Sequence, residues 1–369
     1  MIRKRGKDYW EIRVDIGRDP KTGKRLWKYT SVRGTKRDAE RVEQQLKARH
    51  MQGELTAVRM TVDELLDEWL AHVRTNREGR TYDDYAYCTR RIRAAFGPMR
   101  VDRLTRAQIQ RWLDELQQAP RDDGRPGNLS ATTVQKHHRA LHAALSYAVR
   151  MGYLGYNPAD NLTLPRRQRS EPPMLTREQL EQLLEAALGT RWYPLWYVAA
   201  HTGLRVGELC GLWWEDIDWS RPAIRVRRAL KQDREGKRLI LGDVKNHEAR
   251  VVWLDDRTAE VLDRHRAEQQ LEIARAQRWE HPEHVFTAPG GRFLRPDVPT
   301  QVLRKHAKRL GLPPLSMHDL RHIHGSHLLQ YHGWSITAVS ERLGHYSPAF
   351  TAEVYAHVIP GAQEGYLRR

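Results

Sequence analysis

The sequence predicts a predominantly helical α+β chain, in which a small N-terminal sheet with one helix precedes an all-helical unit and a larger mixed unit. Three observations support this prediction. The 369 residues fit two or three domains. Apolar residues recur with a helical period over most of the chain, whereas the alternation typical of strands is confined to short stretches. A charged, proline-rich linker at 157–173 divides the chain, so we expect units at 1–55, 60–156 and 174–369.

The composition points to a polyanionic partner. The chain has 63 Lys and Arg residues against 46 Asp and Glu, a net charge of +17, which is typical of proteins that bind nucleic acid. No stretch approaches the ~18 apolar residues of a membrane span. Cys88 and Cys210 are the only cysteines, which excludes a disulfide framework and an all-cysteine zinc site. We therefore expect a soluble cytoplasmic protein with no membrane partner, although a basic enzyme of another class stays open.

Residues 1–55 are expected to form a small basic module. Apolar and charged residues alternate over 10–16, as in a half-buried strand, and a turn leads to a second strand over 26–32. A helix follows over 35–49. The module has 16 Lys and Arg residues against 8 Asp and Glu, a net charge of +8. It is therefore either an arm that grips DNA or merely a solvated face.

The middle unit, 60–156, is predicted to be entirely helical. A capping box at Thr61 and Glu64 begins its first helix, and Ser130 caps its last. Basic side chains on the polar faces are compatible with contact to a phosphate backbone, but this signal is weak. The linker at 157–173 is basic and extended, so it suits either a strap along DNA or a plain tether. The other predicted helices of this unit cover 81–95 and 105–118.

The last unit, 174–369, combines helices with a short β segment. Thr176 is expected to cap a helix to about residue 188, and glycines at 203–211 begin or bend another. Helices are predicted over the remainder, with breaks at prolines and glycines. The predicted strands are 224–229, 239–245 and 251–254, with a polar hairpin at 232–237.

Two basic residues of this unit have neighbours that suggest chemistry. Arg205 lies between Gly203 and Gly207, which allow close approach of backbone or ligand, and Glu208 follows three residues later on the same helical face. Glu208 is therefore a candidate to hold the Arg205 guanidinium. Lys245 ends a predicted strand at a tight turn. Each residue alone is also explained as an ordinary surface or salt-bridge residue.

Two further segments contain histidines near an arginine or a tyrosine. His318 and Arg321 are three residues apart, so they share a helical face and can converge on one anion. His318 and His322 have the spacing of zinc ligands, but the glutamate of the H-E-x-x-H motif is missing, which argues against a metal. In the second segment, His345 follows Leu-Gly and precedes Tyr355 by ten residues.

Together these segments resemble the catalytic domain of the tyrosine recombinases, the phage integrase family. The family pattern has an Arg in T-G-x-R-x-x-E, a hairpin Lys, H-x-x-R, L-G-H and a Tyr nucleophile nine or ten residues beyond. The resemblance implies that Tyr355, rather than Tyr346 or Tyr366, forms a 3′-phosphotyrosine, and that no metal or cofactor is needed. By the same resemblance, Arg205 and Arg321 bind the phosphate, and Glu208 supports Arg205. Lys245 is the general acid, and His318 is the proton partner of Tyr355. His345 donates a hydrogen bond to the phosphate.

The resemblance also implies a function for the whole chain. It predicts a site-specific recombinase that acts as a homotetramer through a Holliday junction and integrates or excises a mobile element, in the bacterial nucleoid or, if phage-encoded, the host cytoplasm. The helical unit would bind the core DNA site, helped by accessory bending and directionality factors. The N-terminal module would be a three-stranded arm-binding domain, with Arg13, Arg25 and Lys28 facing DNA. A type IB topoisomerase and a non-catalytic DNA-binding regulator are the alternatives.

Overall fold

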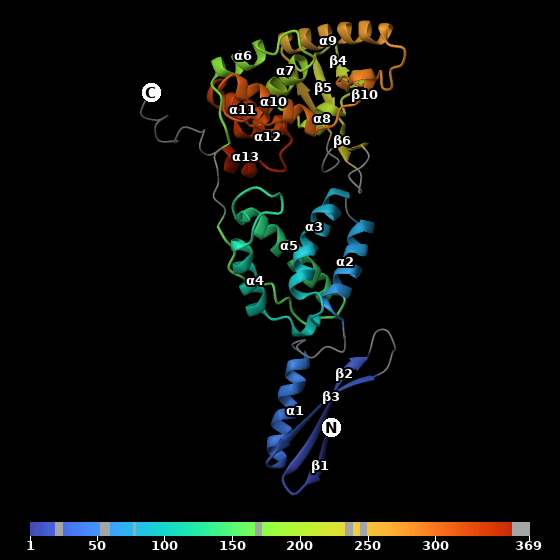
Figure 1. The fold of residues 1–369 in the computed structure, drawn as a ribbon, viewed down its shortest axis with the longest axis vertical. Coiled ribbons are helices and arrows are strands. Elements are labelled where there is room, and N and C mark those ends of the chain that lie inside the picture. The colour runs from blue at the N-terminus through green and yellow to red at the C-terminus, as the bar shows by residue number, and fades with distance from the viewer. Residues whose placement is uncertain are drawn as a thin grey trace, which may run out of the picture. The chain divides into compact units, whose positions relative to one another are not determined.

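A computed structural model describes residues 1–18, 25–51, 60–76, 79–166, 172–232, 239–243 and 249–355. The chain divides into two compact units, Met1–Arg169 and Ser170–Arg369 (Figure 1). The first unit contains two separate hydrophobic clusters, one in the N-terminal module and one in the helical region. None of the described helices is long and apolar enough to cross a membrane.

The N-terminal module is a three-stranded antiparallel sheet with one helix. Strands β1 (Ile2–Gly6), β2 (Tyr9–Arg18) and β3 (Arg25–Arg33) pair in the order β1-β2-β3, and α1 (Lys36–Met51) follows. Ile12 and Val14 of β2 form a small core with Ala39 and Leu46 of α1. Alternation thus places every second side chain of β2 against the helix.

The pairing register decides which basic residues lie on the face away from α1. Arg13 pairs with Tyr29, and its guanidinium stacks on the Trp27 ring at 3.6 Å. Val14 pairs with Lys28, so Lys28 lies on the α1 side of the sheet. The prediction that Lys28 faces outward beside Arg13 and Arg25 is therefore wrong, because residues 25 and 28 of one strand point to opposite faces.

The helical region begins its helices largely where the capping residues predict. The Glu64 carboxylate accepts from the Thr61 backbone N–H at 2.9 Å, and the Ser130 hydroxyl accepts from the Thr133 N–H at 3.2 Å. The second helix begins at residue 79 rather than 81. The elements are α2 (Val62–Asn76), α3 (Gly79–Phe96), η1 (Val101–Arg103), α4 (Arg106–Gln118) and α5 (Ala131–Arg150).

The second unit is helical around short antiparallel sheets (Figure 1). The predicted strand 224–229 is two strands, because β5 pairs with β4 and β8 whereas β6 pairs with β7. The elements are α6 (Arg177–Glu185), α7 (Tyr193–Thr202), α8 (Val206–Cys210), η2 (Trp214–Asp216), β4 (Ile217–Asp218), β5 (Ala223–Val226), β6 (Arg228–Gln232), β7 (Leu239–Asp243), β8 (Arg250–Trp253), α9 (Asp256–Arg275), β9 (Thr287–Ala288), η4 (Pro289–Gly291), β10 (Arg292–Phe293), α10 (Asp297–Arg309), α11 (Met317–Gln330), α12 (Ile336–Leu343) and α13 (Pro348–Tyr355).

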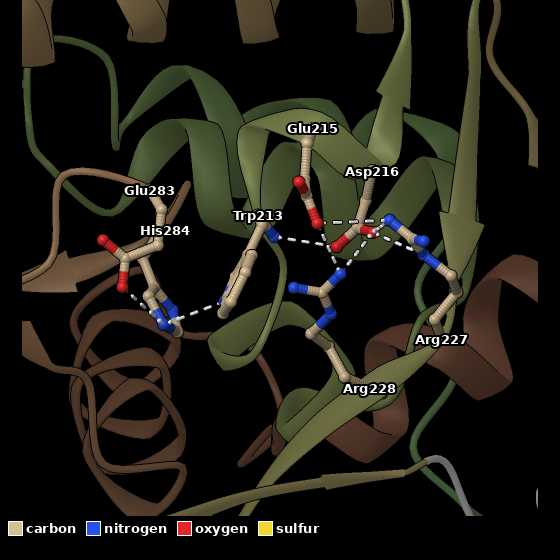
Figure 2. A network of polar contacts seen from close by, with 7 residues as sticks. All are labelled: Trp213, Glu215, Asp216, Arg227, Arg228, Glu283 and His284. Carbon is tan, nitrogen blue, oxygen red and sulfur yellow. Dashed lines mark hydrogen bonds and ion pairs between the residues drawn. The ribbon is translucent and has the colours of Figure 1, made fainter.

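A polar network around the buried Asp216 lies where the chain passes from β5 to β6 (Figure 2). The buried Asp216 carboxylate accepts from Arg227 at 2.6 Å and from Arg228 at 3.2 Å, and the Arg228 guanidinium lies 3.8 Å from the Trp213 ring centroid. The Trp213 indole N–H donates to Nε2 of His284 at 3.0 Å. This bond occupies the lone pair that His284 would need to bind a metal with its neighbours His281 and Glu283, so we assign no metal to that group.

Helix α7 is the buried centre of the unit and determines where the loop after it lies. Almost all its side chains are buried, and it ends at Gly203, whose φ of 67° is in the left-handed region. A side chain at Gly203 would collide with Leu343 of α12 and His324 of α11. The loop that leads to Arg205 therefore lies directly against both of these helices.

Candidate active site

The segments singled out in the sequence meet where α8, α11, α12 and α13 approach one another. Arg205 precedes α8, His318 and Arg321 lie on the first turns of α11, and Tyr355 is the last residue of α13. Figure 1 shows α11, α12 and α13 at one side of the unit. Residues separated by about 150 positions thus reach one place because the buried α7 packs against α11.

The end of α12 holds three arginines through three consecutive backbone carbonyls. Arg250 Nε donates to the carbonyl of residue 342 at 3.0 Å, Arg321 Nη2 to that of Leu343 at 2.6 Å, and Arg205 Nη2 to that of Gly344 at 2.7 Å. The last carbonyls of a helix have no partner within the helix and carry its partial negative charge. They therefore position guanidiniums that would otherwise repel one another.

Glu208 pairs with Arg205. The carboxylate accepts from Arg205 Nη1 at 2.8 Å and from the Arg205 backbone N–H at 2.9 Å. The residue is only 2% exposed. Burial by itself raises the pKa of this carboxyl, but hydrogen bonds and charges from Arg250 and Arg205 outweigh it and lower the pKa to about 2. Glu208 is therefore a carboxylate at neutral pH.

Arg321 is buried, with its guanidinium between two loops. Nη1 donates to the carbonyl of Gly203 at 2.7 Å, while Nη2 bonds the end of α12. Burial, together with the nearby Arg205 charge, lowers the pKa of Arg321 to about 9. The side chain remains charged at neutral pH, so Arg205 and Arg321 form a preorganised pair of cations suited to an anion with several oxygens.

The two predicted histidines differ in their surroundings. His318 is exposed, although the atoms packed around its ring and the Arg321 charge lower its pKa. His345 is half-buried, and its Nδ1 lies 2.8 Å from the Thr351 hydroxyl. Burial and the charges of Arg321 and Arg205 lower the pKa of His345 to about 3. Both rings are therefore neutral near pH 7.

Tyr355 lies inside the unit. It is 1% exposed, and its ring stacks on His345 with centroids 6.4 Å apart. The hydroxyl lies over Gly325 of α11, where a side chain would collide with it, and has no hydrogen-bond partner among the described residues. Burial raises the pKa of Tyr355 to about 12, although the Arg321 charge opposes this. The phenol is therefore protonated at neutral pH.

The structure does not describe every predicted residue, and it brings two residues to this cluster that were not predicted to act there. Lys245, between β7 and β8, lies outside the described residues, as does Tyr366, whereas Tyr346 is exposed. The His322 ring lies between His318 and Tyr355, with centroid distances of 4.5 and 5.9 Å. Its spacing of four from His318 was the available signal. Arg250 had no local signal, because its partners are far away in the sequence.

Comparison with known proteins adds an independent finding. Residues 173–361 match the phage integrase family, and 61–117 match the N-terminal SAM-like domain of phage integrases. A tyrosine recombinase XerC-like protein of Caldanaerobacter subterraneus is 30% identical over 97% of this chain and 94% of its own. The ICEBs1 integrase of Bacillus subtilis is 24% identical over 98% of this chain and 97% of its own.

Solved structures share the fold. The Tn1549 transposon integrase in complex with transposon right end DNA has a TM-score of 0.69 at 21% identity, covering 84% of this chain and 99% of that one. A lambda integrase tetramer bound to a Holliday junction has a TM-score of 0.58 at 18% identity, covering 94% of this chain and 96% of that one. The helical layout with small antiparallel sheets predicted from the sequence is confirmed by these matches.

Proposed function

Because this chain belongs to the phage integrase family of tyrosine recombinases and is therefore a site-specific DNA-cleaving and rejoining enzyme, we propose that Tyr355 is its nucleophile and that Arg205 and Arg321 bind the scissile phosphate. The observation that supports this most is the meeting of Arg205, Arg321 and Tyr355 around the end of α12. A phosphodiester resists attack because its anionic oxygens repel a nucleophile, so preorganised cations are needed first.

The charge of the cluster suits this reaction. Arg205, Arg321 and Arg250 contribute three positive charges and Glu208 one negative charge, which leaves a net charge of +2. Negative charge on the phosphoryl oxygens grows from about one unit toward two when a fifth oxygen approaches phosphorus. Guanidiniums that are already fixed stabilise that added charge without reorganising, which lowers the barrier of the chemical step.

The proposed proton transfers start from the protonation states of Tyr355 and His318, and the part of Lys245 is carried over from the family pattern. Tyr355 is protonated at neutral pH, so its proton must leave as the phenolic oxygen bonds to phosphorus, and the neutral His318 accepts it. The bond between phosphorus and the 5′ oxygen breaks, and Lys245 donates a proton to that oxygen. The products are a 3′-phosphotyrosine and a free 5′-hydroxyl. Since Tyr355 is buried, α13 must turn its hydroxyl outward for attack.

His345 orients the phosphate in this proposal. Its depressed pKa keeps the ring neutral, so it adds no further charge beside Arg321. We place the ring in the tautomer in which Nδ1 accepts from the Thr351 hydroxyl, so that the proton on Nε2 can form a hydrogen bond to a phosphate oxygen. Metal ions and cofactors have no part in these steps.

We further propose that the chain works as a homotetramer on paired core and arm sites of a mobile element in the bacterial cytoplasm, with bending and directionality factors. The 60–156 helices would bind the core site, and the 174–369 unit would catalyse. The Tn1549 and lambda integrase structures contain DNA, and lambda integrase forms a tetramer on a Holliday junction. These relatives support the same assembly here.

Strand exchange between two labelled duplexes tests the proposed function. The duplexes carry the junction sequences that flank the encoding element. We expect a Holliday junction and then recombinant products with the full chain. Relaxation of supercoiled DNA that lacks those sequences serves as the control, since a type IB topoisomerase would relax it efficiently. Efficient site-independent relaxation without strand exchange would contradict the proposal.

Removal of residues 1–55 should separate arm binding from cleavage. The face away from α1 presents Arg13, Arg25 and Tyr29, which suits insertion of a narrow sheet into the major groove. Holding a second DNA site makes its binding intramolecular and raises avidity, so we expect the truncated chain to lose arm binding and recombination of full sites. It should still cleave an isolated core-site duplex, as gel-shift and cleavage assays would measure. Normal recombination by the truncated chain would disprove the arm role.

A further inference from the structure

Arg250 is a half-buried arginine outside the predicted catalytic set. It is the first residue of β8, and its side chain is 12% exposed. Nη1 and Nη2 donate to the two carboxylate oxygens of Glu208 at 3.0 and 2.7 Å, and Nε donates to the carbonyl of residue 342 at 3.0 Å. The guanidinium thus faces the protein rather than a DNA surface, and its planar fork fixes the plane of the Glu208 carboxylate.

Arg250 and Arg205 both bind the Glu208 carboxylate and the end of α12. Oε1 of Glu208 accepts from both guanidiniums, at 3.0 Å from Arg250 and 2.8 Å from Arg205. At the end of α12, the carbonyl of residue 342 accepts from Arg250 and that of Gly344 accepts from Arg205. Arg250 therefore contacts both parts of the structure that hold Arg205, the Glu208 carboxylate and the end of α12.

Close packing also ties Arg250 to the turn that ends α12. Gly344 has a φ of 64°, and a side chain there would lie 2.9 Å from Cδ of Arg250. The backbone that presents the Gly344 carbonyl to Arg205 thus passes directly over the Arg250 stem. A shift of one would displace the other.

We propose that Arg250 is a positioning residue for cleavage, which fixes Glu208 and the end of α12 so that Arg205 is in place before DNA arrives. Arg250 is also a second counter-ion, beside Arg205, for the negative charge of the Glu208 carboxylate. Without Arg250, the buried carboxylate would have Arg205 as its main counter-ion and would draw that guanidinium away from the phosphate. The inference rests on the proposed phosphate-binding role of Arg205.

A double-mutant cycle of Arg250→Ala and Glu208→Gln tests this role. Single-turnover cleavage of a nicked core-site duplex is measured together with the DNA dissociation constant and the melting temperature. Misplacing a catalytic group can cost up to about 10²-fold in rate, so we expect each single variant to cleave on the order of 10- to 100-fold more slowly. Binding should change by less than about threefold, because many other basic residues contact the backbone. The double variant should be no slower than the slower single variant, since both changes break one linkage.

Two further variants complete the design. Arg250→Lys keeps the charge but not the fork, so it should cleave faster than Arg250→Ala and more slowly than the unmodified chain. Arg225→Ala is the matched control, because Arg225 lies on the paired strand β5 with its side chain 59% exposed and binds Asp218 instead. Its cleavage rate should be unchanged.

The outcomes distinguish the inference from the function on which it depends. The positioning role would be overturned if the loss of cleavage rate in the double variant equalled the product of the two single losses. It would also be overturned if folded Arg250→Ala cleaved at the wild-type rate. If Arg250→Ala does not fold, Arg250→Lys decides: slow cleavage with unchanged binding supports the role, and a wild-type rate rejects it. If the unmodified chain forms no covalent complex with DNA, the proposed function itself fails.

Discussion

Replacing Tyr355 with phenylalanine should abolish covalent attachment to DNA while leaving DNA binding intact. Only the hydroxyl is removed, and it is the proposed nucleophile. The ring contacts with His345 and Gly325 remain. Because the buried hydroxyl has no hydrogen-bond partner among the described residues, its removal should not lower the melting temperature. A nicked core-site duplex traps the covalent complex, which is detected on a denaturing gel.

Tyr346→Phe is the matched control for this experiment. Tyr346 is exposed and adjacent to His345, but it lies at the wrong spacing to be the nucleophile. We expect this variant to form the covalent complex at the normal rate. A complex formed by Tyr355→Phe, or its loss in Tyr346→Phe, would show that the nucleophile has been assigned wrongly.

Replacing Arg205 or Arg321 with alanine should slow cleavage far more than it weakens binding. Removal of one preorganised charge stabiliser typically costs on the order of 10²–10³ in rate. The structure predicts a difference between the two variants. Arg321 is buried and donates hydrogen bonds to the carbonyls of Gly203 and Leu343, so Arg321→Ala should also lower the melting temperature. Arg205 is more exposed, so Arg205→Ala should change mainly the cleavage rate. Cleavage kinetics, binding and thermal unfolding measured on the same samples separate these effects.

Two controls accompany the arginine variants. Arg321→Lys keeps a charge but loses the paired carbonyl contacts, so an intermediate rate is expected. Addition of EDTA should leave cleavage by the unmodified chain unchanged, because the proposed steps use protein side chains alone. Equal losses of binding and cleavage would instead indicate that the arginines merely position the DNA.

Local features of this protein are determined by the sequence alone. The capping residues Thr61 and Ser130 act through hydrogen bonds that span three residues, and their helices begin beside them. The pairing of Arg205 with Glu208 is also a contact over three residues. Such contacts depend on helical geometry, which is the same in any helix, so residue type and spacing predict them. The order and spacing of the motifs likewise identify the family without reference to packing.

Other features were decided only by the tertiary structure. The split of one predicted strand into β5 and β6 depends on which distant strands pair with each half. The contacts of Arg321 with Gly203 and of Arg205 with Gly344 span 118 and 139 residues, and the role inferred for Arg250 depends on a carboxylate 42 residues away. The burial of Tyr355 similarly follows from the space that Gly325 leaves on α11. No local periodicity predicts these long-range contacts. They form when the buried α7 and the end of α12 pack into one unit and their unpaired carbonyls accept hydrogen bonds from nearby arginines.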